Sequence, residues 1–430
     1  MKNNKFIKST LILILGGFIT KVLGFLIRII YTRIVGEEAI SLYTIITPTY
    51  SLIITIAASF LPIAISKLVS ENTKNNQKLL FNSFLLIMLI DIILISITIL
   101  FGKYIAYHLL KEKRTLYLIY AMAITIPFVS ASSLFKGYFF GKQKMYPNVI
   151  SNVIEQITRV FLIIFVIPIL AKRNIILSVA GLILFNIITE IISCLVFISF
   201  LPRKAKLKKD NLKLSFSYLK DILKISIPLT SSRLIGNIGF FFEPILLTNI
   251  LLIKGFSNQY ILSSYGIYNA YTISLLTMPN FFIMAISSAI IPEISRFYAK
   301  RNFKMIRKRF KEAIYMALFL GISFSLFILV FRSNLLQILY KTTKGNEYIK
   351  ILGPIFVLFY LEGPLTSTLQ AIGKSNETFK ISTIGIIIKL SLMSLLAFLK
   401  LGIYSLIIAE IINIFIVVIL SSLKVKKELF

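Results

Sequence analysis

The sequence contains no tryptophan and, among its 430 residues, only one cysteine and one histidine. Cys194 has no second cysteine with which to form a disulfide, and one cysteine with one histidine is too few for a zinc cluster. His108 alone cannot build a histidine metal site. We therefore expect no metal site and no resident cofactor.

Charged residues are also scarce, at 15% of the chain, whereas hydrophobic residues make up 57% and the mean hydropathy is +0.86. A soluble domain averages about 25% charged residues. These values predict an integral membrane protein. The formal net charge of +31 does not indicate nucleic acid, because most Lys and Arg residues lie in short segments between apolar runs, where cytoplasmic cations set topology.

Hydropathy predicts an all-α polytopic membrane protein with about 12 transmembrane helices. The predicted spans are 10–35, 43–65, 79–101, 116–140, 149–170, 175–200, 222–249, 265–291, 312–331, 349–372, 379–399 and 402–423. A basic segment divides them into an N-terminal six-helix lobe (1–201), a linker (202–221) and a C-terminal six-helix lobe (222–430). Short strings recur in order in the two lobes: KVLG at 21–24 and RLIG at 233–236, PIAISK at 62–67 and PEISR at 292–296, and GK at 141–142 and 373–374. This pattern is typical of parallel repeats that hold a substrate site between them.

The cations of the connecting segments predict the orientation. One side carries the basic N-terminus, Lys67, Lys136, the linker, the segment SRFYAKRNFKMIRKRFK (295–311) and the basic C-terminus. The other side carries Glu37 and Glu38, with only moderately basic segments such as 111–114. By the positive-inside rule both termini are cytoplasmic, and the protein is a multi-pass protein of the cytoplasmic membrane.

The first apolar run carries two cations, Lys21 and Arg28, well inside a segment long enough to cross a bilayer. They lie seven residues apart, so they share one helix face, and Gly17 and Gly24 share it with them. A cation near the bilayer centre costs about 3 kcal/mol, so this stripe should face protein or a water-filled cavity. We interpret it as part of a cavity that accepts an anion; snorkelling or an internal ion pair is the alternative.

The seventh predicted span carries a similar stripe of Ser226, Thr230, Arg233 and Asn237, with no acid one turn away. We therefore add Arg233 to Lys21 and Arg28 as a predicted substrate-binding cation.

In the fifth predicted span, Asn148, Asn152, Glu155 and Arg159 follow one another on a single face. Glu155 precedes Arg159 by four residues, which is the favourable order for a helical ion pair. A structural pair that holds the bundle and a role in the cavity are both open.

Several other acids lie inside the predicted spans. Glu243 (beside Pro244) and Glu362 are candidates for coupling transport to an ion or a proton. Asp91, Glu190 and Glu410 are isolated acids, for which we favour an interhelical hydrogen bond over an ion site.

Sequence motifs for enzymatic chemistry or nucleotide binding are missing. Gly373-Lys374-Ser375 lacks the earlier glycine of a P-loop, because Thr368 occupies that position. No predicted connecting segment is longer than about 20 residues, which leaves no room for an external catalytic domain. We therefore expect a transporter rather than an enzyme.

Two segments resemble a known family. TKVLGFLIRIIYTRIVGEEAISLY (20–43) and SSLFKGYFFGKQKMYPNVISNVIEQITRVFLI (132–163) are similar to the stage V sporulation protein B family. That family belongs to the multidrug/oligosaccharidyl-lipid/polysaccharide exporter superfamily, to which the lipid II flippases are related. The resemblance implies a MATE-like fold with spans 1 and 7 lining a central cavity. It also places Lys21 at a basic position of the related flippases, with Arg28 one residue away from a second.

These observations predict a flippase that moves a lipid-linked oligosaccharide or a cell-wall precursor across the cytoplasmic membrane by alternating access. Its partners would be a lipid-linked sugar pyrophosphate, membrane lipids and a coupling ion, Na⁺ or H⁺, but no nucleic acid, and the protein would be a monomer. The alternative is an ion-coupled MATE-type multidrug exporter. A cavity rich in cations should repel the cationic drugs that such exporters favour, so the sign of the cavity charge discriminates between the two.

Overall fold

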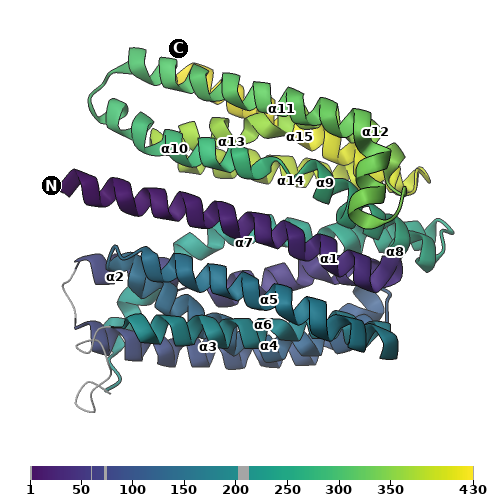
Figure 1. Cartoon of the computed structure of the whole chain (residues 1–430), viewed down its shortest axis with the longest axis horizontal. Coiled ribbons are helices and arrows are strands. Elements are labelled where there is room, and N and C mark those ends of the chain that lie inside the picture. Colours follow the sequence, from purple (N-terminus) through teal and green to yellow (C-terminus); the bar gives the residue numbers. More distant parts are fainter. Residues whose placement is uncertain (1, 60, 72–74, 202–212, 430) are drawn as a thin grey trace. The chain divides into compact units, whose positions relative to one another are not determined.

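The structure is a computed structural model that describes residues 2–59, 61–71, 75–201 and 213–429 (Figure 1). The side chains of residues 2–14, 59, 228, 229 and 231–233 lie outside this description. The described residues form α-helices with two π-helical segments, Ile105–Leu109 and Ile267–Ile273, and no strand occurs among them. The predicted all-α class is therefore confirmed.

The chain divides into two compact units, Met1–Phe241 and Phe242–Phe430. The first unit contains α1 (Lys2–Ser59), α2 (Pro62–Glu71), α3 (Asn76–Tyr104), α4 (Thr115–Gly141), α5 (Tyr146–Arg173), α6 (Ile175–Phe200) and most of α7 (Phe216–Ile253). Within it, α5 packs between α1 and α6, and α4 contacts α2, α3 and α6 (Figure 1). A buried apolar cluster that includes Leu68, Phe139, Phe197 and Ile222 joins α2, α4, α6 and α7.

The second unit contains the end of α7, α8 (Asn258–Gly266), α9 (Ser274–Leu276), α10 (Asn280–Ala299), α11 (Phe303–Tyr340), α12 (Asn346–Leu352), α13 (Phe356–Ala371), α14 (Ser375–Phe398) and α15 (Tyr404–Leu429). Within this unit α13 packs against α10, α11 and α15, and α14 packs against α15. The close approach of α10 and α13 depends on Gly363, because a Cβ atom there would lie 2.6 Å from the Ser287 hydroxyl.

Ten helices of the described chain are long and apolar enough to cross a membrane, or eleven if α12 and α13, bent by 55°, form one broken span. The chain is therefore a multi-pass membrane protein. The predicted count of about 12 stays a prediction, because one of these segments, Leu15–Glu71, covers most of the first predicted span and all of the second.

The predicted connection between residues 35 and 43 is not a loop. Helical geometry continues on both sides of Gly36, which alone departs from it with φ 77° and ψ −176°. Only glycine adopts this region without strain, since it has no Cβ. A straight helix of this length would far exceed the bilayer thickness of about 30 Å, so the break at Gly36 separates two segments.

Helices also extend into segments predicted as basic connections. The segment 295–311 is helical except around residues 300–302. Lys136, which we grouped with the cations of the connecting segments, lies inside the predicted span 116–140 and within α4. The linker was predicted to run to residue 221, but α7 already begins at Phe216; residues 202–212 of the linker lie outside the description. Hydropathy does not detect these helical residues, because it responds only to apolar runs. Lys and Arg are nevertheless good helix formers, so a helix can continue beyond its apolar part.

Contacts within the first unit agree with the predicted grouping of its connecting segments. Arg114, between α3 and α4, forms an ion pair with Glu38 at 2.5 Å, so two segments that were predicted to lie on the same side are at the same end of the unit. The hydrogen bond that Arg114 donates to Glu112, together with this pair, raises the pKa of Arg114 above its ordinary value. Near the other end of the first unit, Asn82 Oδ1 of α3 accepts a hydrogen bond from the backbone N–H of Ser215, just before α7, at 2.8 Å.

Candidate functional site

The predicted cation stripe on α1 lies on a face that the helix does not use for close packing. A Cβ atom at Gly16 would meet Val149 of α5 at 2.3 Å, whereas one at Gly17 or Gly24 would meet nothing within 4 Å. Lys21, between these two glycines on the same face, is exposed, and Arg28 is half-buried. The stripe is therefore accessible, and its role as a substrate site stays a prediction.

Arg233 lies on α7, and its side chain is outside the described part of the structure. Ser226 and Thr230, which precede Arg233 on the same predicted stripe, are buried. Gly236 is open, since no atom lies within 4 Å of a Cβ there. The assignment of Arg233 to a substrate site also stays a prediction.

Glu155 and Arg159 of α5 form the predicted ion pair, with Arg159 Nη2 3.1 Å from Glu155 Oε1. The same guanidinium nitrogen donates to Asn186 Oδ1 at 2.7 Å and to Thr189 Oγ1 at 3.2 Å on α6. The pair is thus part of an interhelical network as well as a contact along one helix.

Two residues that the helical spacing does not connect complete this network. Lys136 Nζ of α4 lies 3.8 Å from Glu155 Oε2 and 3.9 Å from Glu190 Oε2 of α6. Two cations therefore balance two buried carboxylates across three helices. Removing one member of a buried pair costs about 3–5 kcal/mol, because its partner is left uncompensated. This geometry favours a structural role for Glu155 and Arg159.

The second unit contains a comparable cluster around a lysine that the sequence analysis missed. Lys389 Nζ of α14 lies 2.6 Å from Glu243 Oε2 of α7 and 2.5 Å from Glu410 Oε2 of α15. The Tyr265 hydroxyl of α8 donates to Glu243 Oε1 at 3.0 Å, immediately before the π-helical segment. One cation here faces two carboxylates, so the three groups carry one net negative charge when all are ionised.

The remaining acids differ in their partners. Asp91 accepts a hydrogen bond from Ser130 at 2.7 Å, and Glu190 and Glu410 pair with lysines, which agrees with the interhelical roles we favoured for them. The side chain of Glu362 on α13 has no such partner among the described residues. Nowhere in the described ranges do three or more His, Cys, Asp or Glu side chains form a group that could hold a metal ion.

Lys136 and Lys389 could have been found from the sequence by one signal, a cation inside an apolar helix, which is the signal that singled out Lys21. Lys389 lies in the run IIIKLSL (386–392) and follows Arg159 by about 230 residues, close to the spacing of the repeated strings. In the first unit Arg159 pairs with an acid of its own helix, α5, whereas in the second unit Lys389 of α14 pairs with acids of two other helices.

Comparison with protein families decides the classification. Residues 6–298 match the model of the family described as "Polysaccharide biosynthesis protein". The chain belongs to the polysaccharide biosynthesis protein family. Residues 244–395 of this family member also match the MatE family model.

Relatives of this chain include stage V sporulation protein B of Bacillus subtilis (strain 168). The two are 32% identical over 92% of this chain and 79% of the relative, which confirms the resemblance predicted from residues 20–43 and 132–163. The lipid II flippase MurJ of the same organism is 24% identical over 91% of this chain and 77% of the flippase.

Solved structures show the same fold. An inward-facing multidrug resistance MATE family transporter matches with a TM-score of 0.74 and 16% identity, covering 95% of this chain and 94% of that one. The lipid II flippase MurJ in an inward closed conformation matches with a TM-score of 0.70 over 96% of this chain and 87% of that one. The MATE-like fold is thus confirmed, and both of these fold relatives are transport proteins.

Proposed function

We propose that this protein is a flippase that moves a lipid-linked sugar precursor, either an oligosaccharide or a peptidoglycan-type cell-wall unit, from the cytoplasmic to the outer leaflet. The observation that carries the proposal is the accessible stripe of Lys21 and Arg28 on α1, well inside its first apolar run. Membership of a polysaccharide biosynthesis family and similarity to a protein named lipid II flippase support the substrate class.

The pyrophosphate of such a substrate is the group that the cations would recognise. Lys21 offers a compact point charge, while Arg28 and Arg233 offer forked guanidinium groups, and both kinds of cation bind phosphate oxygens well. The cations need to hold the head group only part-way across and then release it. We propose alternating access of two six-helix lobes, 1–201 and 222–430, joined by the linker 202–221, in a monomer.

The second candidate is a multidrug exporter, which the MatE match over residues 244–395 favours. A drug exporter for cationic compounds would be impeded by Lys21 and Arg28, whereas a flippase for an anionic head group would depend on them. Charge reversal at these positions therefore separates the two functions.

The driving force is proposed to be the membrane potential or an ion gradient. Moving one charge through 100 mV is worth about 2.3 kcal/mol, so an interior-negative potential favours outward movement of an anionic pyrophosphate. For ion coupling by Na⁺ or H⁺, Glu243 and Glu362 remain the candidates. Glu243 shares Lys389 with Glu410, so a change in its protonation would alter the charge balance of that cluster.

The test is transport of a labelled lipid-linked sugar pyrophosphate in reconstituted vesicles with an imposed potential. Lys21→Glu and Arg233→Glu should abolish flipping at matched protein levels, while Lys21→Arg should retain substantial activity because the charge remains. Lys172→Glu, which reverses an exposed cation at the end of α5, is the matched control and should leave activity unchanged.

Wild-type flipping in both charge-reversed variants would refute the cationic site. Faster transport of a cationic dye by Lys21→Glu would favour the drug exporter. If wild-type flipping ignores the potential, Glu362→Gln should abolish its dependence on a Na⁺ or H⁺ gradient.

A further inference from the structure

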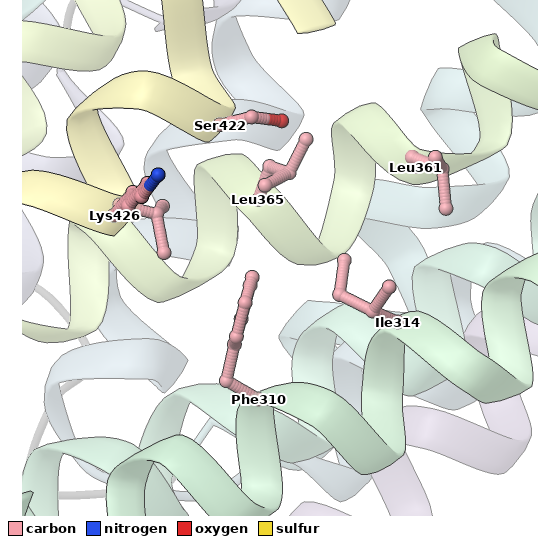
Figure 2. Close-up of a pocket in the computed structure, with 7 residues that line it drawn as sticks. Phe310, Ile314, Leu361, Leu365, Ser422 and Lys426 are labelled. Carbon is pink, nitrogen blue, oxygen red and sulfur yellow. The ribbon is translucent and has the colours of Figure 1, made fainter. Parts of the chain in front are cut away.

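The second unit has an open groove between α11, α13 and α15 with a volume of about 400 Å³. Its lining is drawn in Figure 2 and comprises Phe310 and Ile314 of α11, Leu361 and Leu365 of α13, and Ser422, Val425 and Lys426 of α15. Lys426 lies at one end of the groove in this view and Leu361 at the other. The groove is therefore apolar along its length and carries one charge at its end.

The groove lies where the basic ends of two helices adjoin their apolar parts, which is where we expect lipid head groups to meet lipid tails. Phe310 lies near the start of α11 and Lys426 near the end of α15, and the Arg307 side chain donates to the Leu429 carbonyl between these two helix ends. Both ends are rich in Lys and Arg, and the groove extends from them along the apolar parts of the helices. Basic sites between transmembrane helices are typical binding places for anionic lipid head groups.

The ion pairs around the groove indicate which cation is available. Lys424, two residues before Lys426, pairs with Glu377 at 3.1 Å and Glu428 at 3.5 Å. Arg309, beside Phe310, pairs with Glu293 at 3.0 Å and Glu312 at 2.8 Å. Lys426 is exposed and forms no ion pair with any residue that the structure describes.

An acyl chain gains little by leaving the bilayer for this groove, because lipid tails are as apolar as its leucine and isoleucine side chains. The head group must therefore determine which lipid occupies the groove. We infer that the groove binds an anionic glycerophospholipid, with one acyl chain between Phe310, Ile314 and Leu365 and its phosphate at Lys426. The proposal concerns a structural lipid and does not depend on the transported substrate.

The absence of tryptophan from the chain permits a direct test, since one introduced indole is the only one present. Phe310→Trp places it in the groove. Tyr315→Trp places it on the same helix at a site that is 66% exposed and outside the groove lining. Each variant is reconstituted into vesicles that contain either dibrominated phosphatidylglycerol or dibrominated phosphatidylcholine at the same mole fraction and bromine position. Because the bromine atoms lie at the same position in both lipids, the depth of the indole affects both quenching constants equally and does not change their ratio.

We expect the phosphatidylglycerol-to-phosphatidylcholine ratio to be about fivefold in the Phe310→Trp variant, the preference that one lysine near an anionic surface provides, and near one in the Tyr315→Trp variant. Adding Lys426→Gln to Phe310→Trp should return the ratio to near one. Adding Lys427→Gln instead removes the neighbouring charge outside the groove and should leave the ratio at about fivefold. Equal ratios at the two indoles, or insensitivity to Lys426→Gln in protein that elutes as folded wild type, would overturn the proposal. Displacement of the quencher only by an added polyprenyl phosphate would likewise overturn it, in favour of a substrate tail.

Discussion

The ammonium of Lys389 lies 2.6 Å from a carboxylate oxygen of Glu243, and these residues come from helices that begin almost 160 residues apart, at Phe216 and Ser375. Glu410 of α15 approaches the same ammonium at 2.5 Å. The cluster therefore joins α7, α14 and α15 through one charge, and a neutral substitution of Lys389 leaves two carboxylates without their counter-charge.

Lys389→Met should lower the free energy of unfolding by about 3–5 kcal/mol, because both carboxylates lose their counter-charge. Thermal unfolding in detergent measures the change, and the double variant with Glu243→Gln should recover part of it. Lys380→Met is the control on the same helix. Its pair with Glu377 is exposed, so its loss should cost at most about 1 kcal/mol. Equal effects of the two lysine substitutions would contradict a stabilising cluster.

In the first unit, charge balance predicts the outcome of single and double substitutions. Glu155→Gln leaves Arg159 and Lys136 with only Glu190, and Arg159→Met leaves Lys136 with two acids. Each single variant should lower the folded yield. The double variant leaves the neutral pair of Lys136 and Glu190 and should recover much of the yield, as measured by size-exclusion chromatography. Normal yield with lost transport in both single variants would instead assign Glu155 and Arg159 to the substrate site.

Glycine packing provides a test that does not involve charge. A Cβ atom at Gly137 of α4 would lie 2.7 Å from the Pro62 backbone of α2, which cannot move aside as a side chain can. Gly137→Ala should therefore destabilise the protein by about 1–3 kcal/mol. Gly17→Ala is the control, since a Cβ there meets nothing within 4 Å and alanine favours the helix. A thermal unfolding temperature that is unchanged in Gly137→Ala would show that α2 and α4 do not pack closely.

Orientation can be measured with introduced cysteines, because Cys194 is the only natural one and Cys194→Ala removes it. A membrane-impermeant maleimide added to intact cells should label Lys113→Cys and Lys172→Cys. It should label Lys206→Cys and Lys427→Cys only after the membrane is opened, since the positive-inside rule places the linker and the C-terminus in the cytoplasm. Labelling of Lys206→Cys in intact cells would refute the proposed arrangement of two lobes.

Sequence patterns were sufficient for the features that depend on residues close together in the chain. Long apolar runs predicted a helical membrane protein because each helix satisfies its own backbone within one segment. The four-residue spacing of Glu155 and Arg159 predicted their ion pair, which the structure confirms at 3.1 Å. The helix limits were less accurate, as for α11 and the first turns of α7, since hydropathy detects only the apolar part of a helix.

Tertiary structure alone decided which buried charges meet. Lys136 could be assigned to Glu155 and Glu190, and Lys389 to Glu243 and Glu410, only once the helices were packed, because the partners come from separate helices and no spacing along the chain relates them. The groove at Lys426 likewise requires α11, α13 and α15 together. The sequence by itself determined that buried cations needed acidic partners, since an unpaired charge in a membrane is costly, and the packing of helices chose those partners by bringing side chains within reach.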